Sequence, residues 1–260
     1  MPNRTSNSIF LLNFDDPDNP LYDECGNTWT ATNPQLIYDE ELGRYVANFK
    51  DGITQHLVSN ELNVNLTGND YTIEIYYKIE RKPSSWSCLY FIINNNIYYS
   101  SFIQYTNAIE FRNNSNSAQN TNELQTNLFY SWIHLVIVYE DLFSTANIYI
   151  NGKKEYTYTS LKKVSYINSD IKIGNGFNRA DYNFNGRMAF IHFTKGALYT
   201  SNFNYLKQVT YNKHVHTESN TKRMTAFTYS WNVQRETKWN QKANMYVINP
   251  DHHISQGKKE

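Results

Sequence analysis

Aromatic and amide side chains recur at short intervals between residues 86 and 183. The face of an aromatic ring can pack on the C–H face of a sugar, while amides exchange hydrogen bonds with its hydroxyls. The residues best suited to such a glycan site are Trp86, Tyr98, Tyr99, Tyr105, Tyr182 and Asn183. The same rings could instead fill the core or a protein interface, because the chain holds 22 tyrosines.

Three oxygen-bearing side chains alternate in one short segment, namely Asp181, Asn183 and Asn185. Calcium prefers several carboxylate and carbonyl oxygens that converge from loops, so this segment is a candidate metal site. A single aspartate supplies little charge, and the affinity would be modest. The alternative is a loop whose asparagines adopt unusual φ angles and cap backbone groups. No cofactor is required by these residues, and a calcium ion is possible.

Such side chains need a framework, and three stretches indicate strands. Residues 132–140 are apolar on both faces, as in a strand at the middle of a sheet that is covered on both sides. Asn151-Gly152 then supplies two residues able to adopt positive φ, which a two-residue hairpin turn requires. Residues 71–79 alternate apolar and polar side chains, which predicts a half-buried strand whose exposed face carries Glu74 and Lys78.

Similar short runs, separated by glycine- and asparagine-rich turns, occur along most of the first two hundred residues. Helix is favoured only at residues 200–206, as a single turn capped by Ser or Thr. Many short strands with regular punctuation favour an all-β fold, a two-sheet antiparallel jelly-roll sandwich. The two cysteines, Cys25 and Cys88, cannot build a disulfide framework, and we expect free thiols, with a single bridge as the alternative.

The order of several motifs resembles the laminin-G-like, concanavalin A-like family of lectin-type jelly-roll modules. The motifs are W-x-H at Trp132, Y-I-N-G ending at Gly152, I-x-I-G ending at Gly174 and F-x-G-x-M starting at Phe184. Residues 11–15, 23–27 and 71–75 are similar to that family's opening strand, D-x-x-G-N turn and F-T-I-E-x-W strand. The resemblance covers about residues 8–207. It implies the fold, glycan binding as the commonest activity, and in some members a calcium ion at the rim.

Related sandwiches also include glycan hydrolases, which need two carboxylates facing the scissile bond. In the resembling glucanases these appear as E-x-D-x-x-E on one strand. Here the nearest match runs from Glu74 to Glu80, lacks the intervening acid and carries Lys78 among the exposed positions. We therefore predict that the protein is not an enzyme.

The formal net charge is zero, so the long-range field expected of a nucleic-acid binder is missing. No apolar run approaches the roughly 18 residues of a membrane span, which excludes membrane insertion by a helix. The apolar burst at residues 9–12 is too short for a signal-peptide core, and this favours folding in a cytoplasm. Acids dominate residues 1–51 and bases dominate residues 207–260. The two ends could pair within one chain or between copies of a homo-oligomer, or the imbalance could be chance.

The motif order stops near residue 208, which divides the chain into a sandwich, residues 1–208, and a C-terminal docking arm, residues 209–260. The arm is rich in large side chains, among them Phe227, Tyr229, Trp231 and Trp239. Residues 225–231 alternate well enough to add a strand to an exposed sheet edge of a partner.

These features favour a structural or decoration protein of a phage or virus particle, assembled in the host cytoplasm. The arm would attach to capsid or tail proteins, and the sandwich would stay exposed for a glycan or protein. The alternative is a free lectin or adhesin that reaches the extracellular space or the cell surface by a non-classical route.

Overall fold

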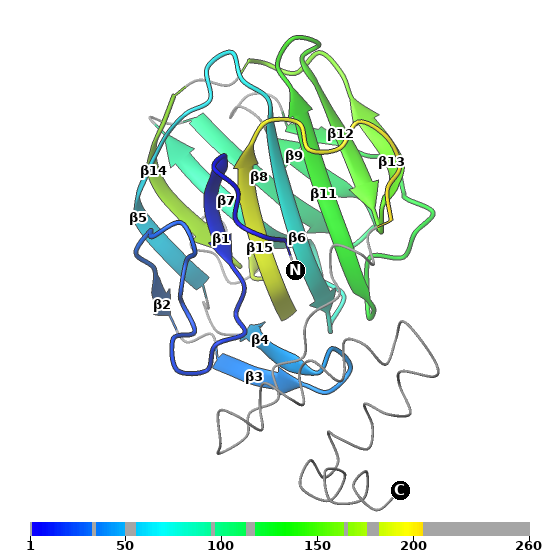
Figure 1. The fold of residues 1–260 in the computed structure, drawn as a ribbon. Helices are drawn as coiled ribbons and strands as arrows, with labels where there is room; N and C mark the ends of the chain where they lie inside the picture. The colour runs from blue at the N-terminus through cyan, green and yellow to red at the C-terminus, as the bar shows by residue number, and fades with distance from the viewer. Residues whose placement is uncertain are drawn as a thin grey trace, which may run out of the picture. The chain divides into compact units, whose positions relative to one another are not determined.

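The computed structural model describes residues 2–32, 35–49, 56–94, 97–112, 118–163, 166–175 and 182–204. Within these residues the strands form two β-sheets, and the strand pairings described in both sheets are antiparallel (Figure 1). The predicted two-sheet sandwich is therefore confirmed. Among the same residues there is no helix that could span a membrane.

The first sheet follows the order β13-β12-β11-β6-β15-β4-β3, and β1 pairs with β15. In its centre, β6 lies between β11 and β15, so that Glu74 faces Val136 on one side and His192 on the other. The strands of this sheet are β1 (Ser8–Leu12), β3 (Gln35–Asp39), β4 (Arg44–Phe49), β6 (Tyr71–Ile79), β11 (Trp132–Glu140), β12 (Thr145–Ile150), β13 (Lys153–Tyr158) and β15 (Gly186–Lys195).

The second sheet follows the order β10-β9-β8-β7-β14-β5-β2. Strand β14 lies between β5 and β7 and so joins segments that are far apart in the sequence. The strands are β2 (Thr30–Thr32), β5 (His56–Asn65), β7 (Trp86–Asn94), β8 (Ile97–Gln104), β9 (Ile109–Arg112), β10 (Ala118–Asn120) and β14 (Tyr166–Ile173).

Alternate residues of both sheets form one apolar core, as the two-residue period of a strand requires. The central strands of the first sheet contribute the buried residues Ile73, Ile75, Tyr77, Ile133, Leu135 and Ile137, and the second sheet contributes Leu89, Ile92, Ile103, Ile171 and Ile173.

Two glycines occupy positions where the local backbone geometry requires glycine or favours it. Asn151 and Gly152 have φ angles of 51° and 81°, and the predicted two-residue turn between β12 and β13 is confirmed. Gly186 starts β15 where the backbone of β6 passes so close that a Cβ atom there would lie 2.0 Å from the Lys78 carbonyl oxygen. Only glycine fits that approach. Cys25 and Cys88 are both free thiols.

The outer face of the first sheet differs from the prediction for residues 71–79. Thr72, Glu74 and Tyr76 are buried, so the strand is not half exposed. The strand is buried because the segment after β15 crosses this face of the sheet. Ala197, Tyr199 and Phe203 of that segment pack against β11 and β12. The predicted helical turn at residues 200–206 is also wrong for its described part, residues 200–204, which has no regular structure.

Candidate functional site

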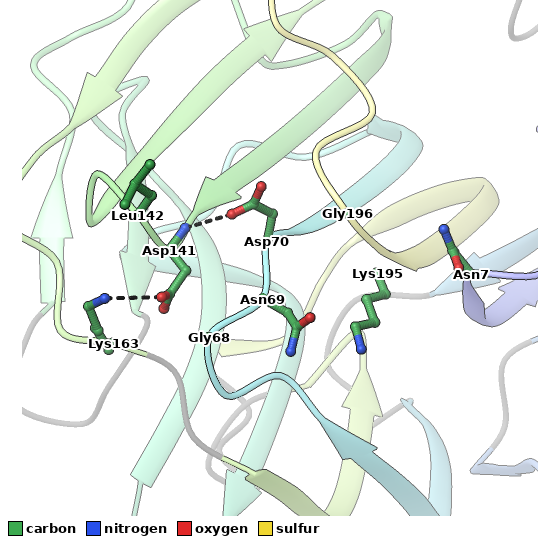
Figure 2. Close-up of a pocket in the computed structure, with 9 residues that line it drawn as sticks. All are labelled: Asn7, Gly68, Asn69, Asp70, Asp141, Leu142, Lys163, Lys195 and Gly196. Carbon is green, nitrogen blue, oxygen red and sulfur yellow. Dashed lines mark hydrogen bonds and ion pairs between the residues drawn. The ribbon is translucent and has the colours of Figure 1, made fainter.

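A pocket of about 600 Å³ opens where several loops meet at one end of the sandwich (Figure 2). Its volume falls in the range of small-ligand sites, roughly 300–1,000 Å³. Segments widely separated in sequence build it: the approach to β1, the loop before β6, the turn after β11, the chain after β13 and the end of β15. The lining residues of this loop-end pocket are Asn7, Gly68, Asn69, Asp70, Asp141, Leu142, Lys163, Lys195 and Gly196.

Two aspartates fix the frame of the loop-end pocket. The Asp141 backbone N–H donates to Oδ1 of Asp70 over 2.8 Å, and the Gly196 N–H donates to the Asp70 carbonyl oxygen over 2.8 Å. The Asp141 carboxylate is buried and accepts hydrogen bonds from the Tyr139 hydroxyl at 3.2 Å and from Lys163 Nζ at 3.1 Å. The loops are thus tied to one another before any ligand arrives.

Other polar groups of the pocket remain available. Figure 2 shows the side chains of Lys195 and Asn69 extending in the same direction from neighbouring segments. Asn69 donates through Nδ2 to the Thr67 carbonyl oxygen at 2.7 Å, which leaves its amide oxygen as an acceptor. Among the described residues, no ion pair or hydrogen bond engages the ammonium group of Lys195. The Asn7 backbone carbonyl accepts from the Lys195 N–H at 2.9 Å and holds the two segments together.

An apolar tip stands beside these polar groups. Leu142 and Phe143 follow β11 and are 80% and 66% exposed, which makes them the most exposed large hydrophobic residues in the described part of the chain. Their turn is closed by a hydrogen bond from the Ser144 N–H to the Asp141 carbonyl oxygen at 3.2 Å, and the Ser144 carbonyl accepts from the Leu161 N–H at 2.9 Å. The side chains are therefore held outward by an ordered turn.

The predicted glycan-binding aromatics lie elsewhere in the sandwich. Trp86 and Tyr182 come together against the buried side chains of Cys88 and Phe91, in a cluster separate from the main core. Tyr105 is 52% exposed, and its N–H donates to the carbonyl oxygen of Ser85, next to Trp86. Tyr98 and Tyr99 lie on β8, but their side chains fall outside the described part of the structure.

Of the predicted calcium ligands, the structure describes Asn183 and Asn185. Asp181 lies outside the described residues. Asn183 is buried, and its amide oxygen accepts a hydrogen bond from Nδ2 of Asn175. The carbonyl oxygen of Asn185 accepts from the Glu80 N–H at 3.1 Å. In the described ranges, no group of three or more His, Cys, Asp or Glu side chains is placed to hold a metal ion.

The outer face of the first sheet carries a buried cluster of ionisable side chains that was not predicted from the sequence. Glu74 lies between His192, with Nδ1 at 3.3 Å from Oε2, and His134, with Nε2 at the ion-pair distance of 3.6 Å from Oε1. The Tyr199 hydroxyl donates to Oε1 at 2.5 Å. His192 Nε2 also bonds the hydroxyls of Ser8 and Thr194, each at 2.8 Å.

Burial by itself would raise the pKa of Glu74, but the interactions with His134 and His192 and the hydrogen bond from Tyr199 lower it to about 2. The carboxylate is therefore ionised at neutral pH. The signal was present in the sequence, since Glu74, His134 and His192 all occupy the outward parity of their strands. The three side chains form a cluster only because β11, β6 and β15 are neighbours in the sheet.

The residues predicted to dock the protein, Phe227, Tyr229, Trp231 and Trp239, lie outside the described residues, as does the whole range 209–260. The boundary between the sandwich and the arm stays a prediction.

Two antiparallel sheets around one core, with a polar pocket among the loops at one end, define a lectin-like β-sandwich. A family model described as the Concanavalin A-like lectin/glucanases superfamily matches residues 51–202. The chain belongs to that family. No curated protein has a sequence that matches it.

Solved structures of binding domains share this fold. The binding domain of botulinum neurotoxin serotype D is 16% identical, with a TM-score of 0.57 over 78% of this chain and 51% of that one. A structure of botulinum neurotoxin type C, whose cell entry is dependent upon interaction with two ganglioside molecules, is 16% identical, with a TM-score of 0.58 over 80% of this chain and 53% of that one.

Domain 4 of an extracellular arabinanase from Geobacillus stearothermophilus, in complex with arabinotriose, is 16% identical, with a TM-score of 0.56 over 78% of this chain and 97% of that one. This chain thus spans about half the length of the toxin chains and nearly all of the arabinanase domain. At such identities the likeness shows the fold.

Proposed function

We propose that this chain is a non-catalytic carbohydrate-binding domain and that the glycan binds in the loop-end pocket. The observation that carries this proposal is the pocket itself, a concave polar site whose loops are already tied together and whose Lys195 ammonium is unengaged among the described residues. The family and the two glycan-associated structures that share the fold support it.

The chemistry of the lining residues suits a polyhydroxylated ligand. Lys195 Nζ donates to a hydroxyl or carboxylate oxygen, and the free amide oxygen of Asn69 accepts from a hydroxyl. The side chain of Leu142 offers apolar surface to the C–H face of a sugar ring. Because the frame of Asp70 and Asp141 is set in advance, little ordering cost opposes binding.

Two carboxylates of β6 and its following loop argue for binding without hydrolysis. Glu74 is buried between two histidines, and its lowered pKa prevents it from serving as a protonated acid at neutral pH. Glu80 is held by Arg187, with Nη2 at 2.7 Å from Oε1. A glycosidase needs one carboxyl group with a raised pKa and a second one across the scissile bond.

The test is binding of the full-length protein to a glycan array, with and without calcium, followed by titration of the selected glycan. Lys195→Ala should weaken binding at least tenfold, since a charged hydrogen bond contributes about 1.5–3 kcal/mol. Lys154→Ala removes an exposed lysine of β13 and should leave the affinity unchanged. Equal affinity of all three proteins for the glycan would place the site outside the loop-end pocket.

The wider setting of the domain is also a proposal. Attachment to a phage or virus particle through residues 209–260, with the glycan as an external target, remains a prediction, and so does homo-oligomerisation. The alternative, a free lectin or adhesin, predicts the same pocket chemistry without a particle partner. Detection of the protein on purified particles separates the two.

A further inference from the structure

The apolar tip beside the pocket has no role in the folded core. Leu142 lines the loop-end pocket but is 80% exposed, and Phe143 next to it is 66% exposed. Isolated exposed hydrophobic residues are common on protein surfaces. Two consecutive ones at the end of an ordered turn, next to a ligand-sized cavity, are a feature that a binding role explains.

The exposed charged side chains on the segments next to the tip are lysines. Lys162, Lys163 and Lys195 are exposed, and the chain that carries the first two runs alongside the turn through the Leu161–Ser144 hydrogen bond. The acidic groups facing the same region are Asp70 and Asp141, and the Asp141 carboxylate is buried and paired with Lys163. An exposed apolar tip with exposed lysines on neighbouring segments suits the interface of a membrane, whose surface is anionic and whose interior is apolar.

We infer that the natural ligand is a membrane glycolipid, with its sugar headgroup in the loop-end pocket beside Leu142 and with Phe143 inserted into the apolar edge of the bilayer. This inference rests on the proposed function, because the pocket must bind the glycan. It adds that the domain binds the glycan and the lipid surface at the same time. The tip contributes affinity only where the sugar is anchored in a membrane.

The experiment compares three probes with the full-length protein: phosphatidylcholine vesicles containing mixed gangliosides, the same vesicles without them, and the oligosaccharides released from those gangliosides. Binding is measured by vesicle flotation and by calorimetry. The variants are the tip substitution Phe143→Ser, which leaves the pocket lining intact, the pocket substitution Lys195→Ala, and the control Tyr130→Ser. Tyr130 is an exposed aromatic residue whose N–H donates to the Ile79 carbonyl, at the end of β6 remote from Asp70.

The expected result is that the unmodified protein binds ganglioside vesicles at least tenfold more tightly than the released oligosaccharides, and does not float with plain vesicles. The tip variant should lose that tenfold gain and keep its affinity for the oligosaccharides, while Lys195→Ala loses both. Tyr130→Ser should behave like the unmodified protein. Unchanged melting temperatures would show that the tip variant is folded.

Any one of four results would overturn the inference. Equal affinity for vesicles and free oligosaccharides, with no effect of the tip variant, would leave a pocket that binds glycans without a membrane. Equal flotation with plain vesicles would show lipid binding that needs no sugar. Absence of binding to either ganglioside probe by a protein that binds glycans on the array would reject the glycolipid and spare the proposed function, whereas an empty array rejects both.

Discussion

Replacing Glu74 by glutamine should remove a large part of the acid sensitivity of the fold. The folded-state pKa of Glu74 is about 2, against an ordinary value of 4.5. A difference of that size corresponds to about 3 kcal/mol, at 1.36 kcal/mol for each unit of pKa. Because the folded pKa is the lower one, this stabilisation is fully present above about pH 4.5 and is lost as the pH falls toward 2.

Urea unfolding followed by tryptophan fluorescence, from pH 7 down to pH 2, measures the effect. At neutral pH the Glu74→Gln variant should be less stable by about 3 kcal/mol, since it removes the ionised carboxylate that His192 and Tyr199 contact. The difference between the two proteins should shrink by about 3 kcal/mol between pH 5 and pH 2. Tyr199→Phe removes one hydrogen bond of the carboxylate, and its acid transition should begin at a higher pH than that of the unmodified protein. Parallel stability curves for the unmodified protein and Glu74→Gln would refute the reasoning.

Three further predictions concern the fold, the second aromatic cluster and the arm. Gly186→Ala should destabilise the protein by about 3 kcal/mol or more in urea unfolding, because its Cβ would clash with the β6 backbone, while Gly26→Ala, with open space around it, should cost about 1 kcal/mol. Trp86→Ala and Tyr182→Ala should change the affinity for the glycan by no more than about twofold in calorimetry. The reason is that the whole length of β6 separates Asp70, in the pocket, from the start of β7 at Trp86. A tenfold loss would instead place the glycan site at the cluster of Trp86 and Tyr182. Truncation after Lys207 should leave a cooperatively melting sandwich that no longer attaches to a particle, and failure of the fragment to fold would place the arm within the core.

Much of the fold could be predicted because its signals are local. Residues 132–140, which are apolar on both faces, form the interior strand β11, and the asparagine and glycine at 151–152 form the expected turn. The motif order identified the family, which the match over residues 51–202 now shows. Each of these signals lies within a few neighbouring residues.

The outer face of the first sheet could not be predicted in the same way. Alternation at residues 71–79 indicates which side chains share a face, but it does not reveal that the segment carrying Tyr199 and Phe203 covers that face. Glutamate on an outward position reads as solvent-exposed until its histidine neighbours on β11 and β15 are known. Burial of Glu74 is a property of three strands together.

The loop-end pocket was missed for a related reason. Its lining comes from segments spread between Asn7 and Gly196, and no single segment carries a signal for the pocket. The exposure of Leu142 and Phe143 cannot be seen in the sequence. The aromatics that were predicted to bind a glycan do gather in part, as Trp86 and Tyr182 show, but in a different cluster.

The most direct test of glycan recognition by the pocket is a crystal structure of the full-length protein with the glycan selected on the array. We predict sugar density over Lys195 and Asn69, with hydroxyl oxygens within hydrogen-bonding distance of the Lys195 ammonium. Density over Trp86 and Tyr182, with an empty loop-end pocket, would contradict the assignment of the site.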